Sequence, residues 1–235
     1  MSTALRYEVK MVAQAAFYSK LRMFMRMDQS AIRTLYPARR IQSVYFDTWK
    51  NQALEENLAG ISHREKVRLR WYGEATTGVH GTLERKVREN MMGWKGLLDI
   101  PVDLEVEGVT RRDFAKSLRP YLTEEWQDVL NKNLLPVQWI AYDREYYATE
   151  AGTGPIRITV DRQLRTCDQR MRRRLSSRFP SPTPDVLIVE AKCAEADYDE
   201  LKKVMSRFPM QIDRCSKFVY ASSPNDGSTP SYLPL

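Results

Sequence analysis

The residues best suited to chemistry are cations spaced two apart in segments that alternate charged and apolar side chains. In the segment 65–72, Lys66, Arg68 and Arg70 alternate with apolar residues. Side chains two apart in a β-strand point to the same face, so these three cations share one face of a predicted strand. Guanidinium and ammonium groups in such a row are suited to binding phosphate oxygens.

The same alternation recurs along the chain, and cations outnumber carboxylates on the charged faces. A solvated face of an open antiparallel sheet would give this alternation. A closed sheet, with helices outside and charges inside, would also explain the excess of cations and the bulky apolar faces that carry Trp71, Trp139 and Tyr7. Buried cations repel one another unless an anion lies among them, so the closed arrangement predicts a polyphosphorylated ligand. The charged faces comprise Arg6, Glu8 and Lys10; Lys66, Arg68 and Arg70; Glu84 and Lys86; Arg144; Arg157; Glu190 and Lys192; and Lys217.

The composition narrows the class of protein. The 235 residues carry a formal net charge of +7, which favours an acidic partner such as a phosphorylated small molecule, a nucleic acid or an anionic membrane surface. No known nucleic-acid motif occurs, so no nucleic acid is expected. Three cysteines without a CxxC pair and only two histidines argue against a zinc knuckle or a Ser-His-Asp triad. Reduced thiols, no signal peptide and no transmembrane segment predict a cytoplasmic protein.

Hairpin-forming strands rather than βαβ units predict an α+β fold with an antiparallel sheet. A single domain is predicted over 1–221, followed by a disordered tail at 222–235 that is rich in Ser and Pro. Pro120 should kink or divide the most convincing helix. The predicted strands are 6–10, 42–48, 65–72, 81–88, 136–148, 157–164, 185–192 and 215–221. The predicted helices are 13–27, 110–132 and 196–208. Loops are predicted at 49–64, 73–81 and 90–96, and a basic, mobile loop is predicted at 170–181.

Taken together, these segments resemble VTC-domain proteins, the polyphosphate-polymerase branch of the triphosphate tunnel metalloenzymes and CYTH-like proteins. The similarity runs from about Arg6 to Ala221, and the chain resembles the stand-alone bacterial members of the family. Arg6 stands where triphosphatases and CYTH proteins typically have the first glutamate of an ExExK motif, and this resembles the polymerase branch. The motifs, in family order, are RYEVK at 6–10, SVYFDT at 43–48, KVRLRWYG at 66–73, LERK at 83–86, YDREYY at 142–147, RITVD at 157–161, VEAK at 189–192 and SKF at 216–218.

The resemblance implies a closed, eight-stranded antiparallel β-barrel, a triphosphate tunnel with helices packed outside. It implies that Glu190 is the principal ligand of Mn²⁺ or Mg²⁺. Glu8 and Glu84 could be further metal ligands or ion-pair partners of neighbouring cations. The residues predicted to be catalytic are Arg68, Arg70, Arg144, Arg157 and Lys217, and those predicted to bind substrate phosphates are Lys10, Lys66, Lys86, Lys192 and Ser216.

The implied function is a metal-dependent polyphosphate polymerase that transfers the γ-phosphoryl group of ATP to pyrophosphate or a growing polyphosphate chain. The same tunnel could serve a triphosphatase, with water as the acceptor, or a module that binds nucleotide or polyphosphate without turnover. No protein partner is indicated. The arginine run that starts at Arg170 is either a solvated loop or an entrance and exit patch for polyphosphate.

Overall fold

The computed structural model describes residues 6–89, 92–132, 134–151, 153–183, 185–213 and 215–222. These residues form one eight-stranded antiparallel sheet in the order β1-β8-β7-β6-β2-β3-β4-β5, which confirms the predicted α+β class. The strands are β1 (Arg6–Gln14), β2 (Arg33–Asp47), β3 (His63–Tyr72), β4 (Thr82–Glu89), β5 (Met92–Asp99), β6 (Leu135–Ala151), β7 (Gly154–Asp168) and β8 (Val186–Ala194). The helices are α1 (Tyr18–Met27), α2 (Gln52–Leu58), α3 (Arg111–Leu118), α4 (Glu124–Leu130), α5 (Tyr198–Ser206) and α6 (Lys217–Ser222), with short 3₁₀ turns at Ala15–Phe17, Arg119–Tyr121 and Glu195–Asp197.

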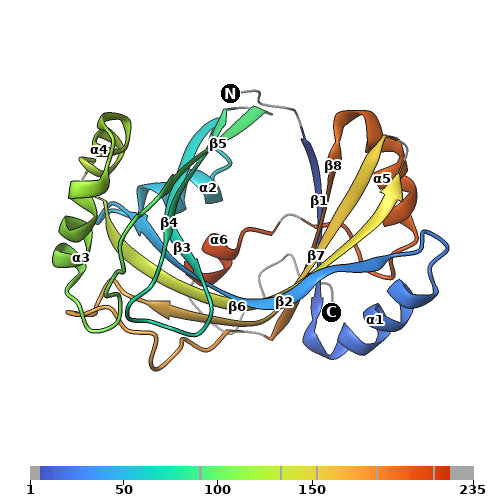
Figure 1. Cartoon of the computed structure of the whole chain (residues 1–235), viewed down its shortest axis with the longest axis horizontal. Helices are drawn as coiled ribbons and strands as arrows, with labels where there is room; N and C mark the ends of the chain where they lie inside the picture. The colour runs from blue at the N-terminus through green and yellow to red at the C-terminus, as the bar shows by residue number, and fades with distance from the viewer. Residues whose placement is uncertain are drawn as a thin grey trace.

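The predicted closure of the sheet into a barrel is wrong. In the described residues, β1 and β5 are the two edges of the sheet and do not pair with each other. The sheet bends into an arch instead, with β5 and β1 at the ends of its two limbs (Figure 1). An ion pair of 3.8 Å between Lys86 of β4 and Glu8 of β1 joins the limbs through side chains, where a barrel would use backbone hydrogen bonds. We call the inner, charged surface of the arch the concave face.

Two hydrophobic clusters cover the outside of the arch. The first packs α3 and α4 against β2, β3, β4 and β6, and it buries Trp71 and Trp139, as expected for apolar strand faces covered by helices. The second packs α1 and α5 against β1, β7 and β8. Thr110 caps α3 by accepting a hydrogen bond from the Asp113 N–H, and Pro120 divides the predicted helix 110–132 into α3 and α4.

The predicted last strand, 215–221, is wrong because this segment contains the short helix α6. The helix lies within the arch (Figure 1), where the ring of Phe218 stacks on that of Tyr45 with centroids 5.0 Å apart. A six-residue helix gains little from its own hydrogen bonds, so this packing decides the conformation. The residues after Ser222, where the tail was predicted, lie outside the described part of the chain.

Two connections predicted from the sequence differ from the structure. Most of 90–96 belongs to β5, and the connection 49–64 contains α2. The basic segment 170–181 is a loop, as predicted, and it contacts the rest of the protein through the buried Leu175 and a backbone hydrogen bond of 2.7 Å from Ser181 N to Thr166 O. No helix in the described residues is long and apolar enough to cross a membrane.

Candidate functional site

The carboxylate of Glu190 is the centre of one charged cluster on the concave face. Antiparallel register places Glu190 of β8 opposite Lys10 of β1. Four cationic nitrogens surround it: Lys217 Nζ at 3.1 Å, Lys192 Nζ at 3.2 Å, Lys10 Nζ at 3.5 Å and Arg144 Nη2 at 3.7 Å. Burial would raise the pKa of Glu190, but these cations hold it well below its usual value. Glu190 therefore stays ionised and keeps four mutually repelling cations together.

Asp161 of β7 is the second carboxylate of this cluster. Its two oxygens accept hydrogen bonds of 2.5 and 2.6 Å from the guanidinium of Arg144, and one oxygen lies 2.6 Å from Lys217 Nζ. The cationic groups of Arg144 and Lys217 both lie over the ring of Tyr142. The ring centroid is 5.3 Å from Arg144 Cζ and 5.1 Å from Lys217 Nζ. Burial would lower the pKa of Lys217, but Asp161 and Glu190 raise it well above its usual value. These contacts fix the two cations in place before any ligand binds.

Glu84 of β4 is the centre of a second cluster on the opposite limb of the arch. It accepts hydrogen bonds from Arg68 at 2.7 and 2.8 Å and from Lys95 at 2.8 Å, and it lies 2.9 Å from Arg70. Burial opposes ionisation, but the three cations lower the pKa of Glu84 to about 2. The phenol oxygen of Tyr45 accepts a further hydrogen bond of 3.0 Å from Arg68. Two guanidinium groups are thus held side by side on β3.

Glu8 of β1 lies between these clusters and is the most exposed of the three carboxylates. Its oxygens are 3.1 Å from Lys10 Nζ and 3.8 Å from the Nζ atoms of both Lys86 and Lys192. Lys10 contacts Glu8 and Glu190 together, so it links the β1 edge to the first cluster. Glu8 and Glu84 both form ion pairs with neighbouring cations, and the metal-ligand role of either residue stays a prediction.

Lys66 of β3 and Ser216, the residue before α6, form a contact that joins the sheet to the helix. Lys66 Nζ lies 2.9 Å from Ser216 Oγ. Burial, and then the charges of Lys10, Lys86, Arg64 and Arg88, lower the pKa of Lys66 to about 7. Lys66 is therefore poised to gain a proton when an anion binds near it.

Anion binding to the concave face is expected to weaken as pH rises from 6 to 8, because Lys66 loses its charge over this range. A bound phosphate should raise the pKa of Lys66, so binding at pH 8 should take up a proton. Calorimetric titration with tripolyphosphate in buffers of different ionisation enthalpy measures this uptake, and Lys66→Met should abolish it. A proton uptake that persists in Lys66→Met would contradict the assignment.

Arg157 of β7 differs from the other predicted arginines because its side chain is exposed and, within the described residues, no ion pair is recorded for it. Its Cα is paired with that of Lys192, and it shares the concave face with Thr159 and Asp161. Arg157 therefore marks the part of the face where a cation is available to a ligand without breaking an existing contact.

The structure brings all the predicted site residues to the concave face of the arch or to the start of α6 beside it. Sequence analysis assigned no catalytic, phosphate-binding or metal-binding role to Asp161, Tyr45, Tyr142 or Lys95, all of which contact the cations or carboxylates of the site. Tyr142 could have been found, because it is two residues from Arg144 in a predicted strand. Lys95 could not, since Gly93 and Gly96 in its segment indicated a loop.

The fit of a divalent metal to these residues is limited. Within the described residues, no three His, Cys, Asp or Glu side chains converge as a metal site. Glu190 and Glu8 are the two carboxylates that share the neighbour Lys10, and Glu8 is the more exposed of the two. This donor set fits a hard cation that takes one or two carboxylates and is otherwise held by substrate phosphates and water, as Mg²⁺ often is.

Comparisons with known proteins agree with the resemblance found in the sequence. The model of the VTC domain family matches residues 4–223. No curated protein matches the chain in sequence. A "putative adenylate cyclase" from Vibrio parahaemolyticus has a similar fold, with 12% identity, 94% of this chain and 100% of that chain covered, and a TM-score of 0.51.

Two further solved structures give lower scores. They are the PH1819 protein from Pyrococcus horikoshii OT3, with 13% identity, 91% and 96% coverage and a TM-score of 0.49, and HpAC1 from Hippeastrum, with 10% identity, 90% and 93% coverage and a TM-score of 0.47. HpAC1 is described as having a dominant triphosphatase activity.

Proposed function

The chain belongs to the VTC domain family, and from this premise we propose that it is a metal-dependent polyphosphate polymerase. It transfers the γ-phosphoryl group of ATP to pyrophosphate or to the end of a polyphosphate chain. The observation that supports this most is the excess of cations held in fixed positions on the concave face, where Glu190 and Glu84 each neutralise only part of the surrounding charge. A polyanion supplies the missing negative charge.

The reaction asks the protein mainly to position phosphates and stabilise charge. Arg68 and Arg70 are held side by side by Glu84, so their guanidinium groups can donate hydrogen bonds to phosphate oxygens without reorganising. Arg144 and Lys217 are fixed on the other limb by Asp161. A triphosphate between the limbs would contact both pairs, with Arg157 free to follow the transferred group.

The remaining cations extend this surface. Lys10, Lys86 and Lys192 surround Glu8 and act as point charges on the phosphates of substrate and product. Glu190 and Glu8 would hold Mn²⁺ or Mg²⁺ together with substrate oxygens, and the metal would offset phosphate charge. Ser216 adds a hydroxyl beside Lys66, next to Lys217 in the chain.

A second candidate function is a metal-dependent triphosphatase, and one observation favours it. With a pKa lowered to about 7, Lys66 is partly neutral at neutral pH. In the fraction of molecules in which Lys66 stays neutral with a triphosphate bound, its amine can take a proton from an attacking water molecule. A polyphosphate end is already ionised and needs no such base, so this feature is more useful with water as the acceptor.

The test is an incubation of the purified protein with ATP and Mn²⁺ or Mg²⁺, with and without pyrophosphate. Chains resolved on a gel are compared with free phosphate released, for the wild type and for Arg70→Ala. Long chains that disappear in Arg70→Ala are the expected result. Free phosphate without chains would support the triphosphatase instead. Tight ATP binding with neither product would mean that the face binds anions without turnover.

A further inference from the structure

Two adjoining cavities lie outside the concave face, between α1 and the strands β2, β6 and β7. The larger has a volume of about 460 Å³ and is lined by α1 residues, and the smaller, of about 270 Å³, is lined by residues of α1 and of all three strands. They share Tyr18 and Arg22, so together they form one elongated depression. We call it the α1 groove.

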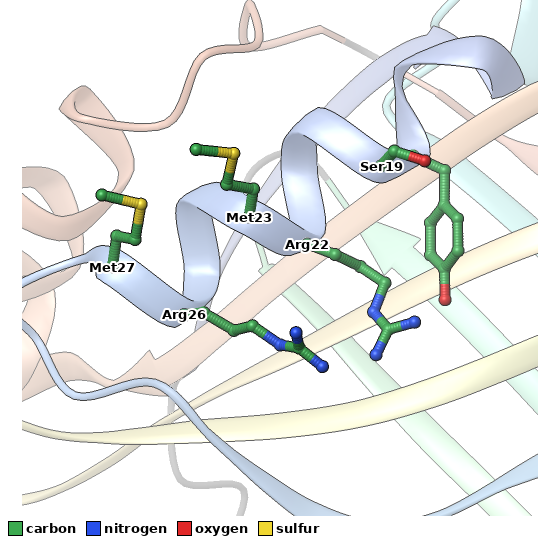
Figure 2. A pocket seen from close by; sticks show the side chains of 6 residues that line it. Ser19, Arg22, Met23, Arg26 and Met27 are labelled. Carbon is green, nitrogen blue, oxygen red and sulfur yellow. The ribbon is translucent and has the colours of Figure 1, made fainter.

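The groove carries uncompensated positive charge. Figure 2 shows the guanidinium groups of Arg22 and Arg26 projecting from the same side of α1, with Met23 and Met27 on another side. No hydrogen bond or ion pair is recorded for either arginine within the described residues, and α1 contains no acidic residue. Like charges four residues apart on a helix repel each other. An anion in the groove would relieve this repulsion.

The one carboxylate at the groove is already neutralised. Glu145 is buried and accepts hydrogen bonds from the hydroxyl groups of Tyr18 and Tyr147, the latter at 2.7 Å, and from Arg162 Nε at 3.0 Å. Its charge is therefore paired with Arg162 and does not offset Arg22. The same contacts fix Tyr18, whose ring lies 5.7 Å from the guanidinium of Arg22. The side chains of Tyr18 and Glu145 are thus held in place in the groove without a bound ligand.

The groove is continuous with the end of the concave face. Tyr36 and Tyr146 line the smaller cavity, and their rings meet edge to face with centroids 5.9 Å apart. Tyr146 follows Arg144 by two residues on β6, and its Cα is paired with that of Tyr36 on β2. The register of β2 shifts twice between residues 34 and 39, next to this cavity. Such irregularities re-aim side chains at the end of a strand.

We propose that the α1 groove is a second binding site for inorganic polyphosphate, which takes the part of a long chain that extends beyond the concave face. The proposal rests on the proposed function, because that function supplies a linear polyanion longer than the concave face can hold. Arg22 and Arg26 bind its phosphates, and Tyr36 and Tyr146 lie along its path. A short anion such as tripolyphosphate occupies the concave face alone.

The test compares the affinities of a long polyphosphate chain and of tripolyphosphate for four variants: Arg22→Gln, Arg26→Gln, both together, and the matched control Lys20→Gln. Lys20 lies on the same helix and is exposed, but it does not line the groove. The double variant should bind the long chain about tenfold more weakly at low salt, with a shallower salt dependence, because fewer counterions are released. Affinity for tripolyphosphate, and the affinities of Lys20→Gln, should stay unchanged.

A second measurement keeps the proposal falsifiable if the double variant unfolds. Hydrogen–deuterium exchange of the wild-type protein should slow in 18–27 and 34–38 when the long chain binds, but not when tripolyphosphate binds. Absence of this protection overturns the proposal, as does an equal loss of affinity in Lys20→Gln. If tripolyphosphate fails to bind while the long chain still depends on Arg22 and Arg26, the proposed function fails and the groove site stands.

Discussion

Replacing Arg157 by alanine is expected to lower kcat/KM for ATP by about 10²–10³-fold, the usual cost of removing one donor that stabilises transition-state charge. The side chain is exposed and has no recorded ion pair in the described residues, so its loss should leave the melting temperature unchanged. Arg144→Ala should lose both activity and stability, because Arg144 is held by Asp161 through two hydrogen bonds. Steady-state kinetics and thermal unfolding of the two variants measure this difference.

Arg165→Ala is the matched control for the first prediction. Arg165 is an exposed arginine on the same strand, β7, and is outside the set that faces the ligand. Its replacement should change neither kcat/KM nor stability. If Arg157→Ala also keeps full activity, Arg157 is a solvated surface residue and phosphate is bound by the paired cations alone.

Glu190→Ala is expected to lower the free energy of unfolding by about 3–5 kcal/mol, since removal of one member of a buried ion-pair group leaves uncompensated charge. Lys217, Lys10, Lys192 and Arg144 would then repel one another without a central carboxylate. Tripolyphosphate should stabilise this variant more than it stabilises the wild-type protein, because the anion replaces the missing charge. Urea unfolding with and without the anion measures both effects.

The pH dependence of Glu190→Gln tests the same point without creating a cavity. The pKa of Glu190 is lowered by folding, so its contribution is present above its unfolded value of 4.5 and is lost as pH falls through the lower folded value. The difference in stability between wild type and Glu190→Gln should therefore shrink in acid. The control is Glu195→Gln, which replaces an exposed carboxylate just after β8. Its free energy of unfolding should equal that of the wild type across the same pH range. A Glu190→Gln protein as stable as the wild type at neutral pH would contradict the central role of Glu190.

Much of the fold follows from alternation in the sequence. The segments around Arg68 and Glu190 alternate charged with apolar residues, and each became a strand with those charges inside the arch. This pattern is local, because the side-chain period of a strand is two residues. The excess of cations on these faces then predicted that the candidate site lies on one face of the sheet, before the pairing of the strands was known.

The remaining features depend on contacts that no local pattern contains. Gly93 and Gly96 lower the strand propensity of β5, but pairing with β4 extends the sheet through them. Phe218 and its neighbours read as a strand, but packing inside the arch makes them helical. The prediction of a closed barrel was wrong for a similar reason. Whether β1 reaches β5 depends on the summed twist and bend of eight strands. Here the side chains of Glu8 and Lys86 meet, but the backbones of the two limbs do not.

The pairing of β1 with β8 has a consequence for how the protein is made. Glu8 is opposite Lys192, so two segments that are among the most distant in the sequence must pair before the Glu190 cluster can form. During synthesis β1 leaves the ribosome early and must wait, with its backbone groups unpaired, until β8 emerges. Folding limited by such a distant contact is slow, and a nascent chain stalled before residue 186 could not assemble the site. The cationic surface is therefore completed only when nearly all of the sheet has been translated.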